Sequence, residues 1–122
     1  VNKNADSTEE LELRLRSTLL DNSCTGYEVL FNVLGPIQIV RWNGRLGDFT
    51  VLGTGGGPIL TTGDVVKATI VGSTITAYVN GVQKLQVDDS TYSSGNPGMG
   101  FFLRGAPGVN EGYGFMSLTA SD

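Results

Sequence analysis

A chain of 122 residues with 39% hydrophobic residues is long enough to bury a core and short enough to form one domain. We therefore predict a single domain over 1–122, with 1–8 frayed at the polar N-terminus. The formal net charge of −4 and the scattered basic residues exclude a phosphate-tracking surface, so no nucleic acid partner is expected. The lack of histidine excludes Ser-His-Asp triads, Cys-His dyads and the usual zinc sites.

The first predicted strand lies at Glu10–Arg16, where apolar and charged residues alternate. Alternation places its three leucines, Leu11, Leu13 and Leu15, on one face, because successive side chains of a strand point to opposite sides. We expect that face to be buried. Residues 21–26 are predicted to form a loop.

Three more strands are predicted before residue 60. Tyr27–Val33 has apolar residues on both faces, which favours a central position in a sheet. Ile37–Trp42 is the next strand and ends at Asn43-Gly44, and Phe49–Leu52 is a short fourth strand. The glycine-rich run Gly53–Pro58 lacks the lysine followed by serine or threonine of a phosphate-binding loop, so we predict a flexible connector there.

Residues 63–81 predict two antiparallel strands more clearly than any other part of the chain. One turn is Gly72-Ser73, and the second strand ends at Asn80-Gly81, the dipeptide that best suits a type I′ hairpin. A third strand follows over Val82–Val87. Alternation groups Val66, Ala68 and Ile70 on one face of the first strand, and Ile75, Ala77 and Val79 on one face of the second.

Strands separated by turns, without a sustained helical period, predict an all-β chain folded as an antiparallel two-sheet β-sandwich. In the last strand, alternation groups Met99, Phe101 and Leu103 on the core side and leaves Phe102 and Arg104 outside. The single cysteine has no partner within the chain, and we expect it to be a buried thiol: Cys24.

The segment from Gly63 to Ala120 resembles the C-terminal half of the concanavalin A-like lectin/glucanase superfamily, in particular its laminin G-like jelly rolls. The matching features are a Gly-Asp start, Ile-x-x-Tyr-x-Asn-Gly, Asp88-Asp89-Ser90, Ser94-Gly95 and Gly98-Met99-Gly100-Phe101. The resemblance implies a jelly roll. Full members carry further strands ahead of this segment, so the chain is expected to be truncated at its N-terminus. Either a smaller sandwich closes by itself, or an apolar edge is covered by another copy in a homo-oligomer.

Catalytic hypotheses find little support in the acidic residues. In the glucanase branch the catalytic carboxylates stand in a Glu-x-Asp-x-x-Glu arrangement, which does not occur here. Glu10 and Glu12 share a face with Arg14 and Arg16, and we expect these arginines to pair with acids across the sheet. Polysaccharide lyases of this shape use a histidine, or a tyrosine, supported by arginine and glutamine. The chain has no histidine, which weakens this assignment too. A glycoside hydrolase or lyase is therefore the least favoured function.

A carbohydrate-binding surface is easier to support, because an aromatic ring stacks on a sugar while amides and arginines bind its hydroxyls. Alternation puts Trp42 and Arg41 on opposite faces, and Trp42 can equally be a packing residue. The candidate carbohydrate-binding residues are Trp42, Arg41, Gln38, Asn43, Phe102, Arg104 and Tyr113.

Three functions follow in order of preference. The first is a secreted, non-catalytic carbohydrate-binding or adhesion-type module with a glycan or polysaccharide partner. The second is an assembly subunit whose incomplete jelly roll is completed by a neighbouring copy, and the third is the hydrolase or lyase. Secretion is expected because the chain begins with Val1, and no apolar run is long enough to span a membrane. The resemblance also implies a structural calcium ion, held by Asp122 or by Asp88 with Asp89.

Overall fold

The computed structural model describes residues 1–3, 10–102 and 113–122, and this described part consists of strands, turns and loops without a helix. All strand pairings are antiparallel. The strands are β1 (Asn2–Lys3), β2 (Glu10–Leu20), β3 (Ser23–Asn32), β4 (Pro36–Arg45), β5 (Phe49–Gly56), β6 (Val66–Val71), β7 (Thr74–Val79), β8 (Val82–Asp88), β9 (Asn96–Phe102) and β10 (Tyr113–Gly114).

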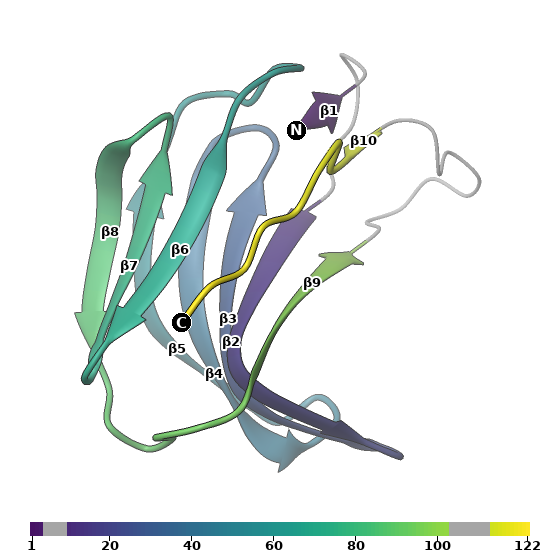
Figure 1. The fold of residues 1–122 in the computed structure, drawn as a ribbon, viewed down its shortest axis with the longest axis vertical. Helices are drawn as coiled ribbons and strands as arrows, with labels where there is room; N and C mark the ends of the chain where they lie inside the picture. The colour runs from purple at the N-terminus through teal and green to yellow at the C-terminus, as the bar shows by residue number, and fades with distance from the viewer. Residues whose placement is uncertain (4–9, 103–112) are drawn as a thin grey trace.

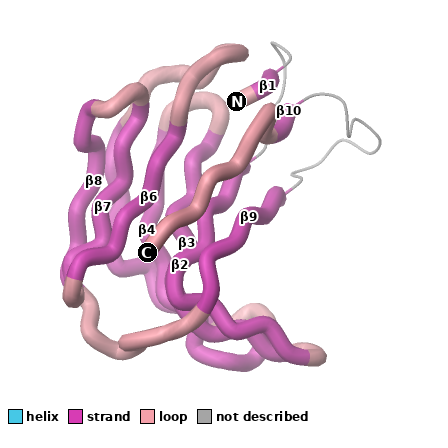
Figure 2. The backbone as a smooth tube through the Cα atoms, in the orientation of Figure 1, coloured by secondary structure: helices cyan, strands magenta, loops and turns pink. Residues whose placement is uncertain are grey.

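Two sheets form the layers of a sandwich. The larger sheet has the order β5-β4-β3-β2-β9 and the smaller one the order β6-β7-β8, while β1 and β10 form a separate pair. Figures 1 and 2 show the three-stranded sheet in front of the five-stranded sheet, with the C-terminal segment running between β6 and β9. The predicted all-β, two-sheet antiparallel sandwich is confirmed, with β3 at the centre of the larger sheet as expected.

The core lies where the inner faces of the two sheets meet. The alternation predicted for β2, β6 and β7 is confirmed, because the leucines of β2 pack against the core side of the smaller sheet. Burying an apolar side chain of this size contributes roughly 1.5–3 kcal/mol. The largest fully buried side chains are Tyr27, Phe31, Leu11, Ile37, Ile39, Leu60, Ile75, Val29 and Val33.

The turn between β7 and β8 has the predicted type I′ geometry. Asn80 and Gly81 have φ values of 50° and 79°, both in the left-handed region. The Asn80 side chain also bridges the turn to the start of β6: its Oδ1 accepts from the Val65 N–H at 2.9 Å, and its Nδ2 donates to Asp64 Oδ1 at 2.9 Å. Asn80 therefore adopts the left-handed φ that the turn requires, and its side chain joins the turn to the start of β6 by two hydrogen bonds.

We expect Asn80→Ala to lower the free energy of unfolding by about 2 kcal/mol, because alanine is strained at this φ and makes neither hydrogen bond. The matched variant Asn80→Gly loses the same two bonds but relaxes the backbone, so its loss should be smaller. Urea denaturation of both variants measures the difference. Equal stability of Asn80→Ala and the unchanged chain would show that the turn does not depend on this residue.

The predicted connector at Gly53–Pro58 is wrong over its first four residues, because β5 continues through Gly56. Glycine is needed here because β8 comes close to the inner face of β5: a Cβ at Gly53 would lie 2.6 Å from Val87 Cγ1, and one at Gly55 would lie 3.3 Å from the Lys84 carbonyl oxygen. The glycines therefore allow close packing of the sheets.

The predicted loop at 21–26 is also wrong, since only Asp21 and Asn22 separate β2 from β3. Similarly, β4 runs through the Asn43-Gly44 dipeptide and ends at Arg45.

A bulge in β2 shifts the register between Leu15 and Thr18. At this bulge Arg16 has a φ of 48°, and its Nη1 donates to the carbonyl oxygens of Gly72 and Tyr92 at 2.8 and 2.9 Å, so the expected pairing with an acid across the sheet is wrong for Arg16.

The sandwich is open along β9. Met99 and Phe101 stand on the core side, opposite the buried leucines of β2, but 49% and 46% of their surfaces are exposed. The smaller sheet ends at β6, which contacts β2, so β9 extends beyond it. A groove of about 670 Å³ lies between β6 and the C-terminal residues 117–122. Leu103, expected on the same side, falls outside the described residues.

The N-terminal residues 1–3 make hydrogen bonds with the rest of the fold. The Val1 ammonium donates to the Asp64 carbonyl oxygen at 2.8 Å, and β1 pairs with β10. Residues 4–8, the rest of the expected frayed segment, are not among the described residues.

Candidate functional site

Three charged side chains and one tryptophan form a cluster on the outer face of the five-stranded sheet. We call it the Arg14 cluster, and its members are Glu12, Arg14, Glu28 and Trp42. Arg14 Nη2 lies 2.9 Å from Glu12 Oε2 and 2.8 Å from Glu28 Oε2. The Trp42 Nε1–H donates to Glu28 Oε2 at 2.9 Å, and the Arg14 guanidinium carbon lies 5.7 Å from the centroid of the Trp42 ring. One arginine thus connects two carboxylates and an indole.

The register of three strands brings these residues together. Arg14 of β2 stands opposite Glu28 of β3, while Trp42 of β4 stands opposite Gly26, the next outward position of β3. On the other side of β2, a Cβ at Gly100 of β9 would lie 2.5 Å from Glu12 Oε2. Gly100 therefore leaves the space that the Glu12 carboxylate occupies.

Both glutamates of the cluster are buried, with exposed fractions of 6% for Glu12 and 4% for Glu28. Burial and, to a smaller extent, the negative charge of Glu12 raise the pKa of Glu28 to about 7, against the opposing effect of Arg14. Burial also raises the pKa of Glu12, against the opposing effect of Arg14. The pair therefore retains a proton to a higher pH than ordinary glutamates do.

Cys24 borders the cluster and is buried, as the sequence predicts. Arg14 Nη1 donates to its Sγ at 3.3 Å. Burial raises the pKa of the Cys24 thiol. The thiol is therefore a neutral neighbour that accepts one of the arginine N–H groups.

An aromatic pair forms the accessible side of the cluster. Trp42 is half-buried and stands opposite Phe49 of β5, with ring centroids 5.4 Å apart and an interplanar angle of 50°. Phe49 is 50% exposed and its outward neighbour Val51 is 46% exposed. Ring surface thus meets solvent directly beside the buried charges, and an arrangement of this kind can hold the apolar face of a ligand.

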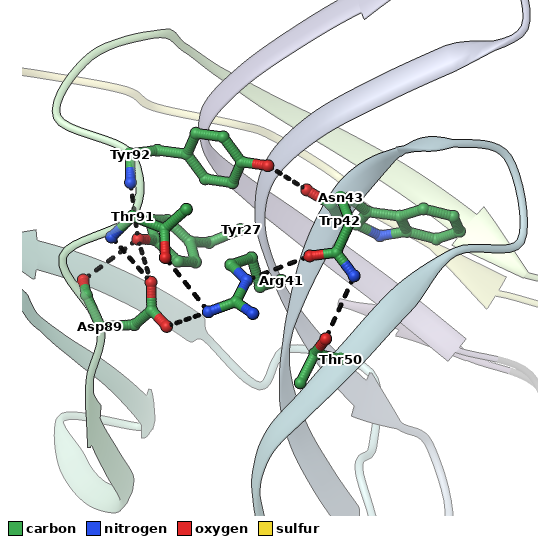
Figure 3. A network of polar contacts seen from close by, with 8 residues as sticks. All are labelled: Tyr27, Arg41, Trp42, Asn43, Thr50, Asp89, Thr91 and Tyr92. Carbon is green, nitrogen blue, oxygen red and sulfur yellow. Dashed lines mark hydrogen bonds and ion pairs between the residues drawn. The ribbon is translucent and has the colours of Figure 1, made fainter.

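Arg41 points to the opposite side of β4, as alternation predicts, and belongs to a second network shown in Figure 3. Its Nη1 pairs with Asp89 Oδ2 and donates to Thr91 Oγ1 at 3.1 Å, and its Nε donates to Asn43 Oδ1 at 3.1 Å. The Tyr27 hydroxyl donates to Asp89 Oδ1 at 2.7 Å. This network ties β3 and β4 to the segment that follows β8.

The network stabilises the ionised form of Asp89. Burial acts to raise the pKa of Asp89, but hydrogen bonds from Tyr27, Thr91 and Arg41 outweigh it and hold the pKa at about 2. Tyr92 extends the network across β4, because its hydroxyl donates to the Trp42 carbonyl oxygen at 2.7 Å. The polar groups of Arg41 and Asn43 are therefore engaged in holding the fold.

The other predicted binding residues are scattered. Gln38 shares the outer face with Trp42, and its Nε2 donates to Thr54 Oγ1 at 3.4 Å. Phe102 lies on the same face but on β9, three strands from β4, which places it roughly 14 Å across the sheet from the Trp42 strand. Arg104 and the side chain of Tyr113 lie outside the described residues. Of the seven predicted residues, those that the structure places on this outer face are Trp42, which belongs to the Arg14 cluster, Gln38 and Phe102.

The sequence predicts calcium at Asp122 or at Asp88 with Asp89, and among the described residues no group of three or more histidine, cysteine, aspartate or glutamate side chains could hold a metal ion. Asp89 faces the Arg41 guanidinium, which is a poor environment for a cation. Asp88 accepts from the Thr74 hydroxyl at 2.6 Å, and Asp122 lines the groove beside β6.

Within the described ranges, the chain has no helix of the length and hydrophobicity that crossing a membrane requires.

The sandwich is similar to a solved structure, the carbohydrate-binding module CBM66 from Bacillus subtilis. The TM-score is 0.66 at 17% sequence identity, and the match covers 84% of this chain and 62% of that one. The chain thus spans less than two thirds of the length of the structure that it matches. No protein-family model and no curated protein sequence matches the chain. The likeness identifies a shared β-sandwich fold.

Proposed function

We propose that this chain is a carbohydrate-binding module, with its ligand on the outer face of the five-stranded sheet, across Trp42 and Phe49 and beside the Arg14 cluster. The observation that carries the proposal is the accessible aromatic pair whose indole N–H is bound to a buried carboxylate. The structural neighbour, the carbohydrate-binding module CBM66, supports the same class of function on the same fold.

The geometry suits a sugar for a physical reason. Aromatic faces stack on the C–H faces of a pyranose or furanose ring, while its hydroxyl groups need polar partners at the edge of the ring. Trp42 is held by its bond to Glu28 and by Arg14, so little conformational entropy is lost when a ligand stacks on it. Gln38 and Thr54 offer further polar atoms on the same face.

The module that we propose is non-catalytic. Hydrolysis needs two carboxyl groups on either side of a glycosidic bond, whereas Glu12 and Glu28 both bind the same Arg14 Nη2 atom and are buried. A structural calcium ion and membership of the concanavalin A-like superfamily, with its laminin G-like branch, are further proposals that rest on the sequence resemblance. Secretion is also a proposal.

We expect Trp42→Ala to weaken glycan binding at least tenfold and Phe49→Ala to weaken it several-fold, because each removes stacking surface. Isothermal titration with oligosaccharides of glucan, mannan, galactan, xylan and fructan measures the affinities. Phe102→Ala is the matched control, since it removes an equally exposed phenylalanine from a distant strand of the same face. Circular dichroism verifies that each variant is folded.

Two outcomes contradict the proposal. In one, the unchanged chain binds no member of the panel. In the other, Trp42→Ala binds as well as the unchanged chain while Phe102→Ala does not, which would move the ligand to β9. Release of reducing ends from the same oligosaccharides would instead support the hydrolase alternative.

A second candidate function is assembly with another copy, favoured by the open edge at β9. Met99 and Phe101 are about half exposed there, and the groove beside β6 is partly apolar. If a neighbouring copy covers this edge, Met99→Ser with Phe101→Ser should convert an oligomer to a monomer. Light scattering over a dilution series measures this, and a monomer at every concentration of the unchanged chain would contradict the assembly function.

A further inference from the structure

The groove beside β6 follows an unpaired edge of the three-stranded sheet. The Val65 carbonyl oxygen accepts from the Asn80 N–H at 2.8 Å, so the odd-numbered residues that follow it bond to β7. Successive residues of an antiparallel strand direct their main-chain groups to opposite sides. The residues that direct theirs into the groove are therefore Val66, Ala68 and Ile70. Among the described residues, no hydrogen bond joins these groups to residues 117–122 across the groove.

The apolar side of this edge is also incompletely covered. The inner side chains of β7 are at most 2% exposed, whereas those of β6, and Leu15 on the floor of the groove, are only partly buried. In a two-sheet sandwich a strand of four to five residues occupies roughly 600–800 Å³, from a rise of ~3.3 Å per residue, a strand spacing of ~4.8 Å and a sheet spacing of ~10 Å. The groove, at about 670 Å³, is therefore the size of one strand.

Main-chain pairing at one end of the groove shows how a strand would enter it. The Val1 nitrogen donates to the Asp64 carbonyl oxygen at 2.8 Å, and the Gly63 N–H donates to the Val1 carbonyl oxygen at 2.9 Å. On its other side the same N-terminal stretch pairs with β10, which leads into the C-terminal segment. Residues 1–3 thus pair both with the chain that leads into β6 and with the chain that leads into the other wall of the groove.

A strand that continues this pairing would run along the groove. Figure 1 shows β6 and the C-terminal segment running in the same direction, with the N-terminus at the end of the space between them. A strand between them is therefore antiparallel to both, like every strand pair of the fold. Direct pairing of β6 with the C-terminal segment would instead need a parallel ladder.

We propose that the groove seats one further strand, joined to the N-terminal side of Val1 and antiparallel to β6 and to the C-terminal segment. This strand connects the three-stranded sheet to the β1-β10 pair. Val1 packs against the core, so the second and fourth residues ahead of it face inward toward Leu13 and Leu15 and are apolar, and the residues between them are polar. The proposal is independent of carbohydrate binding, because the Trp42 site lies on the outer face of the other sheet.

The test attaches four residues directly ahead of Val1 and follows amide hydrogen exchange by NMR. Val-Thr-Val-Thr places both valines inward, and the matched control Thr-Val-Thr-Val has the same composition with the valines outward. In the first variant we expect the amides of Val66 and Ala68 to exchange roughly tenfold more slowly than in the unchanged chain, because they gain hydrogen-bond acceptors. We also expect its Tm to rise by about 5 °C. The Lys67 and Thr69 amides, which bond to β7 in every variant, are the internal reference.

Slower exchange in the first variant alone supports the proposal. Equal slowing in both variants would overturn it, because the groove would then not select an inward apolar face. Unchanged exchange in both would overturn it as well, since the groove would not accept a strand. If the unchanged chain is an oligomer that already protects these amides and loses the protection on dilution, a second copy supplies the strand and the proposed connection to Val1 is wrong.

Discussion

Replacing Arg41 with alanine should lower the free energy of unfolding by about 3 kcal/mol, the cost expected when one partner of a largely buried ion pair is removed. Asp89 would lose its counter-charge, and Thr91 and Asn43 would each lose a hydrogen-bond partner. The side chains of Arg41 and Asp89 are only 25% and 11% exposed, so water replaces these contacts poorly.

Urea denaturation of Arg41→Ala measures the loss, and Arg45→Ala is the matched control. Arg45 is an exposed arginine at the end of the same strand, so its removal should change stability by less than about 0.5 kcal/mol. The variant should also lose part of its acid resistance. Because the pKa of Asp89 is held at about 2 in the folded chain, its contribution is present above its ordinary value of 3.8 and is lost as the pH falls toward 2.

Similar losses for Arg41→Ala and Arg45→Ala would contradict this role of the network. So would an unchanged acid unfolding midpoint in Arg41→Ala. These measurements need no ligand, so they test the Arg41–Asp89 connection between β4 and the segment after β8 whether or not the chain binds a glycan.

Stability should fall as the pH rises from about 4.5 to about 7, because of Glu28. The pKa of this residue is raised from 4.5 to about 7 in the folded chain, mainly by burial. Over this interval the folded state keeps a proton that the unfolded state has released, so the free energy of unfolding decreases with pH. At 1.36 kcal/mol per pKa unit, the decrease attributable to this site is of order 3 kcal/mol.

Glu28→Gln should remove most of this slope, because the amide cannot ionise and its oxygen can still accept from the Trp42 indole. Chemical denaturation at several pH values between 4.5 and 8 measures the slope for each chain. Asp88→Asn, which removes an exposed carboxylate, should retain it. A slope that is equal in Glu28→Gln and the unchanged chain would contradict the assignment, as would stability that rises over this interval.

The layers of the fold could be predicted from the sequence, because each rests on a local pattern. The alternation of Leu11 and Leu13 and of Ile75 and Ala77 identifies buried faces one strand at a time, and Asn80-Gly81 specifies its turn through φ alone. The opposite orientations of Trp42 and Arg41 follow from the same rule.

The candidate site could be predicted only in part, because it depends on register between strands. Glu28 is one more acidic residue in its own strand, and it becomes part of a site only when Arg14 stands opposite and Trp42 lies on the next strand. The bulge at Arg16 and the continuation of β5 through Gly56 could not be predicted for a similar reason. Both depend on close contacts with segments far away in the sequence.

Trp42 is the single tryptophan, so its indole gives one distinct N–H signal and one fluorescence signal from the centre of the proposed site. The hydrogen bond from this indole to Glu28 makes the signal sensitive both to ligand and to the protonation of the carboxylate. Changes on the three-stranded sheet can be followed separately through its main-chain amides.

The most direct test is therefore a titration of the ¹⁵N-labelled chain with an uncharged oligosaccharide, followed by the Trp42 indole resonance. We predict that this resonance and the amides of Phe49 and Val51 shift together and saturate with one affinity. We also predict that the amides of β6 to β8 do not shift. Saturable shifts confined to β6 and the C-terminal residues, with an unchanged indole signal, would contradict the central claim that the ligand lies on Trp42.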